Sequence, residues 1–212
     1  MNWRPCRPQD IEMESFRRIE ARVGGHGLPP REWAVVRRMI HTTGDFEYLA
    51  TVRFHPRAVA AGLEALRQGR PLAADTRMLQ AGISTGRLAR LGVEVFCAMD
   101  DPEVAQEAAR RGTTRAAVAM EQALPRVAGG IVAVGNAPTA LLSLLRLLAA
   151  GAPPPALVVG VPVGFVNAAE AKEALTRQDC PFITALGPKG GSTVAASIIN
   201  ALAVMALAEQ PT

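Results

Sequence analysis

The sequence contains three histidines, which are the side chains best suited to proton transfer near neutral pH. His26 lies in a glycine-rich connection and His55 precedes Pro56, so we expect both to be surface or turn residues. His41 lies at the end of an amphipathic helical pattern, within Met39–Asp45. The residues alone leave two interpretations of His41 open. It caps a helix, or it serves as a general acid or hydrogen-bond donor toward a ligand.

Arg115 is the arginine whose position most favours binding of an anionic group. It follows Thr114, whose hydroxyl group is suited to cap a helix that begins there. An arginine in the first turn opposes the helix dipole, so a role in local stability is not expected. A nearby carboxylate ligand would relieve that conflict. For the other arginines, which are spread along the chain, a solvated basic surface is as good an interpretation as substrate binding.

Three glycine-rich segments each follow an apolar run and precede a helical pattern: Gly135–Thr139, Gly160–Gly164 and Gly187–Ser192. Glycine lets the backbone approach a ligand closely, and helix N-termini offer N–H groups to anions. The three segments therefore predict a broad ligand-binding floor, with sharp strand-to-helix turns as the alternative. None of them fits the dinucleotide or P-loop pattern, which disfavours a nucleotide-binding oxidoreductase or a P-loop enzyme.

Composition excludes several classes of protein. Only 4% of the residues are aromatic, which argues against single-strand nucleic-acid binding, and the net charge is +4 without a basic run. The apolar run Ala140–Ala150 is interrupted and too short to span a bilayer, and Met1–Pro5 lacks the apolar core of a signal peptide. Cys6, Cys97 and Cys180 form neither a disulfide framework nor a CxxC metal site. We therefore expect a cytoplasmic protein that binds no nucleic acid, membrane or metal.

The elements that must position these residues alternate between strands and helices. Five apolar runs predict strands: Pro71–Ala74, Val93–Met99, Gly130–Val134, Ala156–Val159 and Pro181–Leu186. Helices are predicted at Pro102–Arg111, Arg115–Leu124, Pro138–Ala150, Ala168–Leu175 and Ser192–Glu209. The alternation predicts a single α/β domain over residues 1–212, with a five-stranded, mostly parallel, doubly wound sheet.

The N-terminal third of the chain reads as a helical extension to this sheet. Ile11–Arg22 and Pro30–Ile40 have apolar residues at helical spacing, and Gly44 is placed to end the second helix. The pattern leaves open whether these helices cover the sheet or reach a second subunit.

Several segments together resemble the precorrin-8X methylmutase family, in the family's order and over roughly residues 10 to 205. They are Glu14–Arg17, Val36–Glu47, Pro71–Ile83, Gly112–Ala117, Ala133–Leu141, Gly160–Glu170 and Pro181–Ser192. The resemblance implies an α/β isomerase of cobalamin biosynthesis. Such an enzyme moves a methyl group from C-11 to C-12 of precorrin-8X or cobalt-precorrin-8, giving hydrogenobyrinic acid or its cobalt counterpart.

The resemblance also implies a tetrapyrrole polycarboxylate substrate, a homodimer with the substrate near the subunit interface, and no cofactor. His41 occupies the place of the family's catalytic histidine. The residues expected to bind substrate are Ser15, Arg17, Thr42, Thr114, Arg115, Asn136, Thr139, Val163, Gly164, Phe165, Gly190, Gly191 and Ser192. The alternative function is a non-catalytic corrinoid carrier, which would use the same cavity without needing His41.

Overall fold

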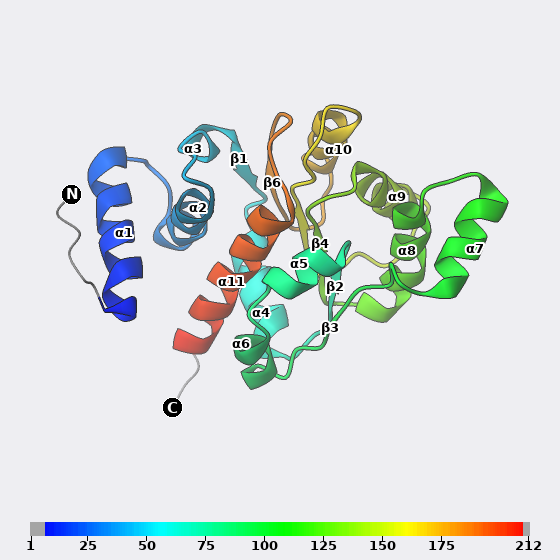
Figure 1. Ribbon diagram of the computed structural model, residues 1–212, viewed down its shortest axis with the longest axis horizontal. Helices are drawn as coiled ribbons and strands as arrows, with labels where there is room; N and C mark the ends of the chain where they lie inside the picture. The colour runs from blue at the N-terminus through cyan, green and yellow to red at the C-terminus, as the bar shows by residue number, and fades with distance from the viewer. Residues whose placement is uncertain (1–6, 210–212) are drawn as a thin grey trace.

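The computed structural model describes residues 7–209, so Cys6 and the Met1–Pro5 segment lie outside the described part of the chain. The fold is a six-stranded sheet with helices on both faces (Figure 1). In spatial order the strands are β1 (Val52–Phe54), β6 (Phe182–Ala185), β5 (Leu157–Gly160), β4 (Ile131–Val134), β2 (Leu72–Ala74) and β3 (Val95–Phe96).

The order of the strands reverses between β2 and β4. The chain runs from β2 outward to β3 and then returns to place β4 on the other side of β2, where Ala73 pairs with Val132. The strands from β2 to β6 are all parallel. The predicted doubly wound, mostly parallel sheet is therefore confirmed, and its switch point lies between β2 and β4.

The predicted number of five strands is wrong, because β1 adds a sixth strand at one edge. It runs antiparallel to β6, with Val52 opposite Ala185. Three residues that include the exposed Arg53 give no recognisable apolar run, so the pattern did not indicate a strand. The strand forms because the edge of β6 offers it backbone partners.

Eleven α-helices and one short 3-10 helix accompany the strands in residues 7–209. The α-helices are α1 (Pro8–Val23), α2 (Pro30–Thr43), α3 (Tyr48–Thr51), α4 (Ala58–Arg67), α5 (Arg77–Gly82), α6 (Thr85–Arg90), α7 (Pro102–Arg111), α8 (Arg115–Ala123), α9 (Pro138–Ala149), α10 (Ala168–Leu175) and α11 (Ser192–Ala208). The helices predicted from α7 onward match within one residue at each end. The helices α3, α5 and α6 were not predicted, because each has only four to six residues. Helix α4 was missed although its buried residues fall at helical spacing, which was the available signal.

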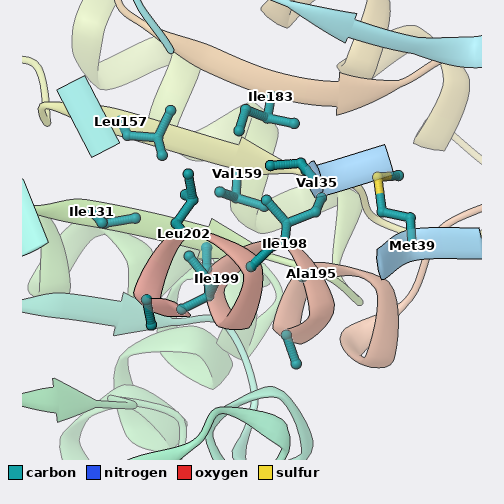
Figure 2. Close-up of a cluster of buried hydrophobic side chains, with 14 of the residues drawn as sticks. Val35, Met39, Ile131, Leu157, Val159, Ile183, Ala195, Ile198, Ile199 and Leu202 are labelled. Carbon is teal, nitrogen blue, oxygen red and sulfur yellow. The ribbon is translucent and has the colours of Figure 1, made fainter. Parts of the chain in front are cut away.

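Helix α11 is the centre of one layer of the core. Figure 2 shows Ile198 and Leu202 of this helix facing Val159 and Ile183 of the sheet, with Val35 of α2 beside them. On the opposite face of the sheet, side chains of α8 and α9 pack against β4, β5 and β6. The two layers bury both faces of the parallel strands, as their continuous apolar sequences require.

The N-terminal helices were predicted to be an extension of the sheet, but α2 forms part of the main core. Helix α2 packs directly on α11, and its Trp33, Val36 and Met39 are buried in the main core. Helix α1 packs on the outer side of α2 (Figure 1). Helix α2 also continues through Thr43 and ends at Gly44, whose left-handed backbone and N–H bond to the Ile40 carbonyl complete the cap. His41 thus lies inside the last turn and is not a capping residue.

Within residues 7–209, every helix is too short or too polar to cross a membrane.

The packing around α11 predicts a large difference between two neighbouring side chains. Leu202 is fully buried, whereas Val204 is 37% exposed. We expect Leu202→Ala to lower the free energy of unfolding by about 2–5 kcal/mol, because the lost side chain leaves a cavity. Val204→Ala, as the matched control, should cost about 1 kcal/mol or less. Urea unfolding of both variants measures the difference, and equal losses would contradict this assignment of the core.

Candidate active site

The loops at the carboxyl ends of β2, β4 and β6 surround a cavity of about 330 Å³. Its lining residues are Thr76, Arg77, Met78, Met99, Asp100, Asn136 and Ser192. A larger cavity of about 510 Å³, with Arg57, Arg177 and Pro181 in its wall, lies at the amino ends of β5 and β6. Ligands of open α/β sheets bind beyond the carboxyl ends at the switch point, so we assign the site to the first cavity.

Asp75 follows β2 directly, and its carboxylate fills the loop that follows β4. Its Oδ1 accepts a hydrogen bond from the Gly135 N–H at 3.1 Å. Its Oδ2 accepts from the N–H groups of Asn136 and Ala137 at 2.8 and 2.9 Å. The expectation that the Gly135–Thr139 loop offers its N–H groups to a ligand is therefore wrong for these three residues. The chain supplies its own anion there.

Burial raises the pKa of the Asp75 carboxyl above its ordinary value, and the three backbone N–H hydrogen bonds act against that shift. Every backbone group that contacts the carboxylate is a donor, which is the pairing that the ionised form requires.

Close backbone contacts join the loop after β4 to the start of α11. A Cβ atom on Gly135 would lie 2.7 Å from the Cα of Ser192, so only glycine fits there. The Ser192 hydroxyl lies 3.1 Å from the Thr76 hydroxyl, which connects α11 to the loop after β2. A Cβ atom on Gly190 would lie 2.1 Å from the Val161 carbonyl oxygen. The sequence analysis expected these glycines to let the backbone approach a ligand. In the structure, they let the loops pack against each other.

Neither α9 nor α11 has a side-chain cap, but Asp75 binds the backbone N–H groups just before α9. Gly191 precedes α11 with a φ of 129°. Ser192, the first residue of α11, lines the cavity. The first-turn N–H groups of this 17-residue helix are therefore available to an anionic group beside the cavity.

The predicted cap at Thr114 is confirmed. Its hydroxyl oxygen accepts a hydrogen bond from the Ala117 N–H at 3.2 Å and donates one to the Thr139 hydroxyl at 2.8 Å. This contact joins the starts of α8 and α9. Arg115 is the first residue of α8 and is exposed, and it forms no ion pair with another residue in the described range.

His41 is half-buried on the side of α2 that faces α1. The edge of its ring meets Phe16, with 5.3 Å between ring centroids and 72° between ring planes. The pKa of the Glu12 carboxyl lies below its usual range. Burial raises this pKa, but a hydrogen bond from Arg38 at 2.8 Å and the charges of Arg38 and His41 lower it by more. His41 therefore has an aromatic and an acidic neighbour on α1.

The other α1 and α2 candidates lie around this position. Ser15 is half-buried on α1 and Thr42 is exposed at the end of α2. Arg17 is exposed and forms two hydrogen bonds of 2.8 Å with Glu14. This pairing lowers the pKa of the Glu14 carboxyl to about 2. A ligand would have to displace Glu14 to pair with Arg17.

The candidates form two groups that a single chain does not bring together. One group, with His41, lies on α1 and α2 at one flank of the sheet (Figure 1). The other, with Arg115, lies on α8 and the carboxyl-end loops toward the opposite flank. Val163 and Phe165, in the loop after β5, lie between these groups, since the Gly164 N–H donates to the Pro188 carbonyl oxygen at 3.0 Å. They are 43% and 95% exposed.

The only two lysines of the chain connect the loop after β6 to the end of α2. Lys172 on α10 is fully buried and donates to the Lys189 carbonyl oxygen at 2.7 Å. The Lys189 ammonium in turn pairs with Asp45 at 2.5 Å and Glu47 at 2.7 Å. These carboxylates hold the pKa of Lys189 above its usual value. The chain of contacts places the end of the His41 helix beside the loop that precedes α11.

Sequence reasoning missed Asp75 and five of the seven residues that line the cavity, which are Thr76, Arg77, Met78, Met99 and Asp100. Asp75 and Thr76 stand directly after a buried strand, a position at which polar residues in an α/β sheet face the ligand crevice. Their place directly after a strand was the sequence signal that could have identified Asp75 and Thr76 as site residues.

A serine motif was also overlooked, because Gly82–Gly86 reads G-x-S-x-G. Its Ser84 lies between α5 and α6 and not on a strand-to-helix turn, so it does not form a nucleophile elbow. Within residues 7–209 there is no group of three His, Cys, Asp or Glu side chains that could hold a metal.

Burial of Lys172 predicts a pH dependence of stability. Desolvation lowers its pKa from 10.5 to about 8, so between these values the unfolded chain binds a proton that the folded chain has released. Stability should therefore rise with pH across this window, by about 1.4 kcal/mol per pKa unit at most. Urea unfolding of the wild type and Lys172→Met at about pH 8 and at pH 10.5 isolates the effect. The same rise in both proteins would show that Lys172 is not its source.

Comparison with known proteins gives one consistent result. The model of the precorrin-8X methylmutase family matches residues 10–205. A cobalt-precorrin-8 methylmutase from Priestia megaterium is 45% identical over 199 residues, covering 94% of this chain and 88% of that protein. A precorrin-8X methylmutase from Pseudomonas aeruginosa is 41% identical over 197 residues, covering 92% of this chain and 94% of that protein.

The solved structures agree with the sequences. A precorrin-8X methylmutase from Thermus thermophilus is 46% identical, and its fold matches with a TM-score of 0.86 over 93% of this chain and 98% of that chain. The same family thus accounts for the sequence, the doubly wound sheet and the near-complete length of the match. The chain belongs to the precorrin-8X methylmutase family.

Proposed function

We propose that this chain is the isomerase that moves a methyl group from C-11 to C-12 of precorrin-8X or cobalt-precorrin-8 in cobalamin biosynthesis. The observation that carries the proposal is the relationship, over more than nine-tenths of the chain, to a cobalt-precorrin-8 methylmutase and to a precorrin-8X methylmutase. The product would be hydrogenobyrinic acid or its cobalt counterpart.

The reaction needs a proton carrier more than it needs a nucleophile. The C-11–methyl bond breaks and the C-12–methyl bond forms within one ring system, so atoms and electrons balance without a co-reactant. A proton lent to the conjugated ring during the migration must be returned afterwards. We assign this acid–base role to His41, because an imidazole can donate and recover a proton near neutral pH. Phe16 at the edge of its ring restricts the orientation of the imidazole.

The substrate's carboxylates need cationic or N–H partners at the rim of the cavity. Arg115 is the first candidate, since it is exposed and forms no ion pair with another described residue. The uncapped start of α11 at Gly191 and Ser192 is the second. Thr114, Asn136 and Thr139 complete this rim as neutral hydrogen-bonding groups.

Apolar contact with the macrocycle is assigned to the loop after β5. Phe165 is 95% exposed in the single chain, which is unusual for a large aromatic side chain. We propose that Phe165 and Val163 pack on the ring when it is bound, and that Gly164 and Gly190 give the loops the space to meet below it. Ser15, Arg17 and Thr42 would contact the substrate from the His41 side.

A homodimer would complete this site. The cavity of one chain, about 330 Å³, is at the lower end of the range of about 300–1,000 Å³ for small-molecule sites. A tetrapyrrole with several carboxylate arms needs more space than this. The helices that carry His41 and Arg115 also lie at opposite flanks of one chain, so we propose that a second copy brings both residues to the same ring. The free thiols of Cys97 and Cys180 suit the cytoplasm that we propose as its location.

The role of His41 is tested by His41→Ala. Loss of the proton carrier should lower turnover by about 100-fold or more, while the pigment still binds. Conversion of precorrin-8X and of cobalt-precorrin-8 is followed by the visible spectrum of the product. His26→Ala, in a histidine that stacks on Trp33 away from the cavity, is the control and should keep its activity. Full activity of His41→Ala would overturn the assignment of His41 as the proton carrier, whereas pigment binding without turnover in the wild type would favour the carrier alternative.

The shared site is tested by mixing two inactive variants. Co-expressed His41→Ala and Arg115→Ala chains should form mixed dimers in which one of the two sites has both native residues. Random mixing then restores about a quarter of wild-type turnover, because half of the dimers are mixed. If both residues acted from the same chain, every site would carry one lesion and no activity would return.

A further inference from the structure

Asp75 has no part in the chemistry assigned above, yet it lies below the residues that line the cavity. It is 4% exposed, and its own N–H donates to the Ala133 carbonyl oxygen at 3.0 Å. Its carboxylate binds three consecutive backbone N–H groups, those of residues 135–137. Three such groups at the start of a helix form a concave anion-binding nest. In this chain a side chain of the protein occupies the nest.

The contacts of Asp75 lead directly to the proposed substrate-binding residues. The N–H of Asn136, whose residue lines the cavity, donates to Oδ2 at 2.8 Å. The N–H of Ala137 is held in the same way just before α9, on which Thr139 binds the cap residue of the Arg115 helix. Thr76, the next residue along, contacts the Ser192 hydroxyl at the start of α11. The carboxylate thus holds the loop after β4, and the neighbouring contacts of Thr76 and Thr139 connect that loop to the starts of α11 and α8.

We propose that Asp75 is the positioning residue of the substrate floor, which orients Asn136 and the start of α9 by filling the anion nest with its own carboxylate. The inference rests on the proposed function, since Asn136 and Thr139 are assigned to substrate there. With Asp75 bound to residues 135–137, Arg115 and the start of α11 are the groups at this end of the sheet that we assign to a carboxylate arm of the substrate.

Removal of the carboxylate should impair binding more than chemistry. Asp75→Ala leaves three buried N–H groups without an acceptor and frees the loop that carries Asn136. We expect KM to rise about tenfold or more and kcat to fall by a smaller factor, because His41 is not displaced. Formate is the probe, since it is the group that the substitution deletes. Added formate should enter the open nest, raise the Tm of Asp75→Ala and return KM toward the wild-type value.

Two controls separate positioning from general stability. Asp75→Asn fills the nest with a neutral amide, so formate should neither raise its Tm nor restore its KM. Leu202→Ala is destabilised in the core far from the nest, so formate should act on it no more than sodium chloride of equal ionic strength does. Wild-type turnover is measured in parallel, and its absence with both ring forms would refute the proposed function and not the role of Asp75.

With an active wild type, a normal KM in Asp75→Ala would overturn the inference. The inference would also be overturned if formate raised the Tm of Asp75→Ala but left its KM high. Asp75 would then support the fold without orienting the floor. Recovery of both Tm and KM by formate in this variant alone is the result that supports it.

Discussion

A buried carboxylate at the point where the sheet reverses its strand order is the constraint on which the site depends. Parallel strands end in loops whose backbone N–H groups need partners, and helix N-termini concentrate such groups. Asp75 meets this need for the loop after β4 with three hydrogen bonds. Gly135 then allows that loop to lie against the start of α11. The floor of the cavity is therefore held by contacts within the protein before any ligand arrives.

This arrangement separates the family from nucleotide-binding proteins with the same kind of sheet. In those proteins, a helix N-terminus at the switch point receives a phosphate of the ligand. Here Asp75 binds the N–H groups just before α9, and we propose that anionic groups bind instead at Arg115 and at the start of α11.

Helix α2, which carries His41, is connected to this floor by ion pairs as well as by its packing in the main core. Lys172 is buried and holds the Lys189 carbonyl, and the Lys189 ammonium pairs with Asp45 and Glu47 just beyond α2. The side of α2 that carries His41 nevertheless faces α1, away from α11. With the proposed acid–base residue on this side and Arg115 on the other flank, the fold suits the dimer that we propose.

The sequence alone determined the class of the sheet, the later helices and the family, because long apolar runs and ordered motifs are local signals. It did not indicate β1, which exists only because the edge of β6 lies beside it. Nor did it show that Asp75 fills the loop at Gly135, since their contact joins residues 60 positions apart. The separation of His41 from Arg115 was likewise decided by tertiary structure, because proximity in space depends on which faces pack together and not on the order of motifs.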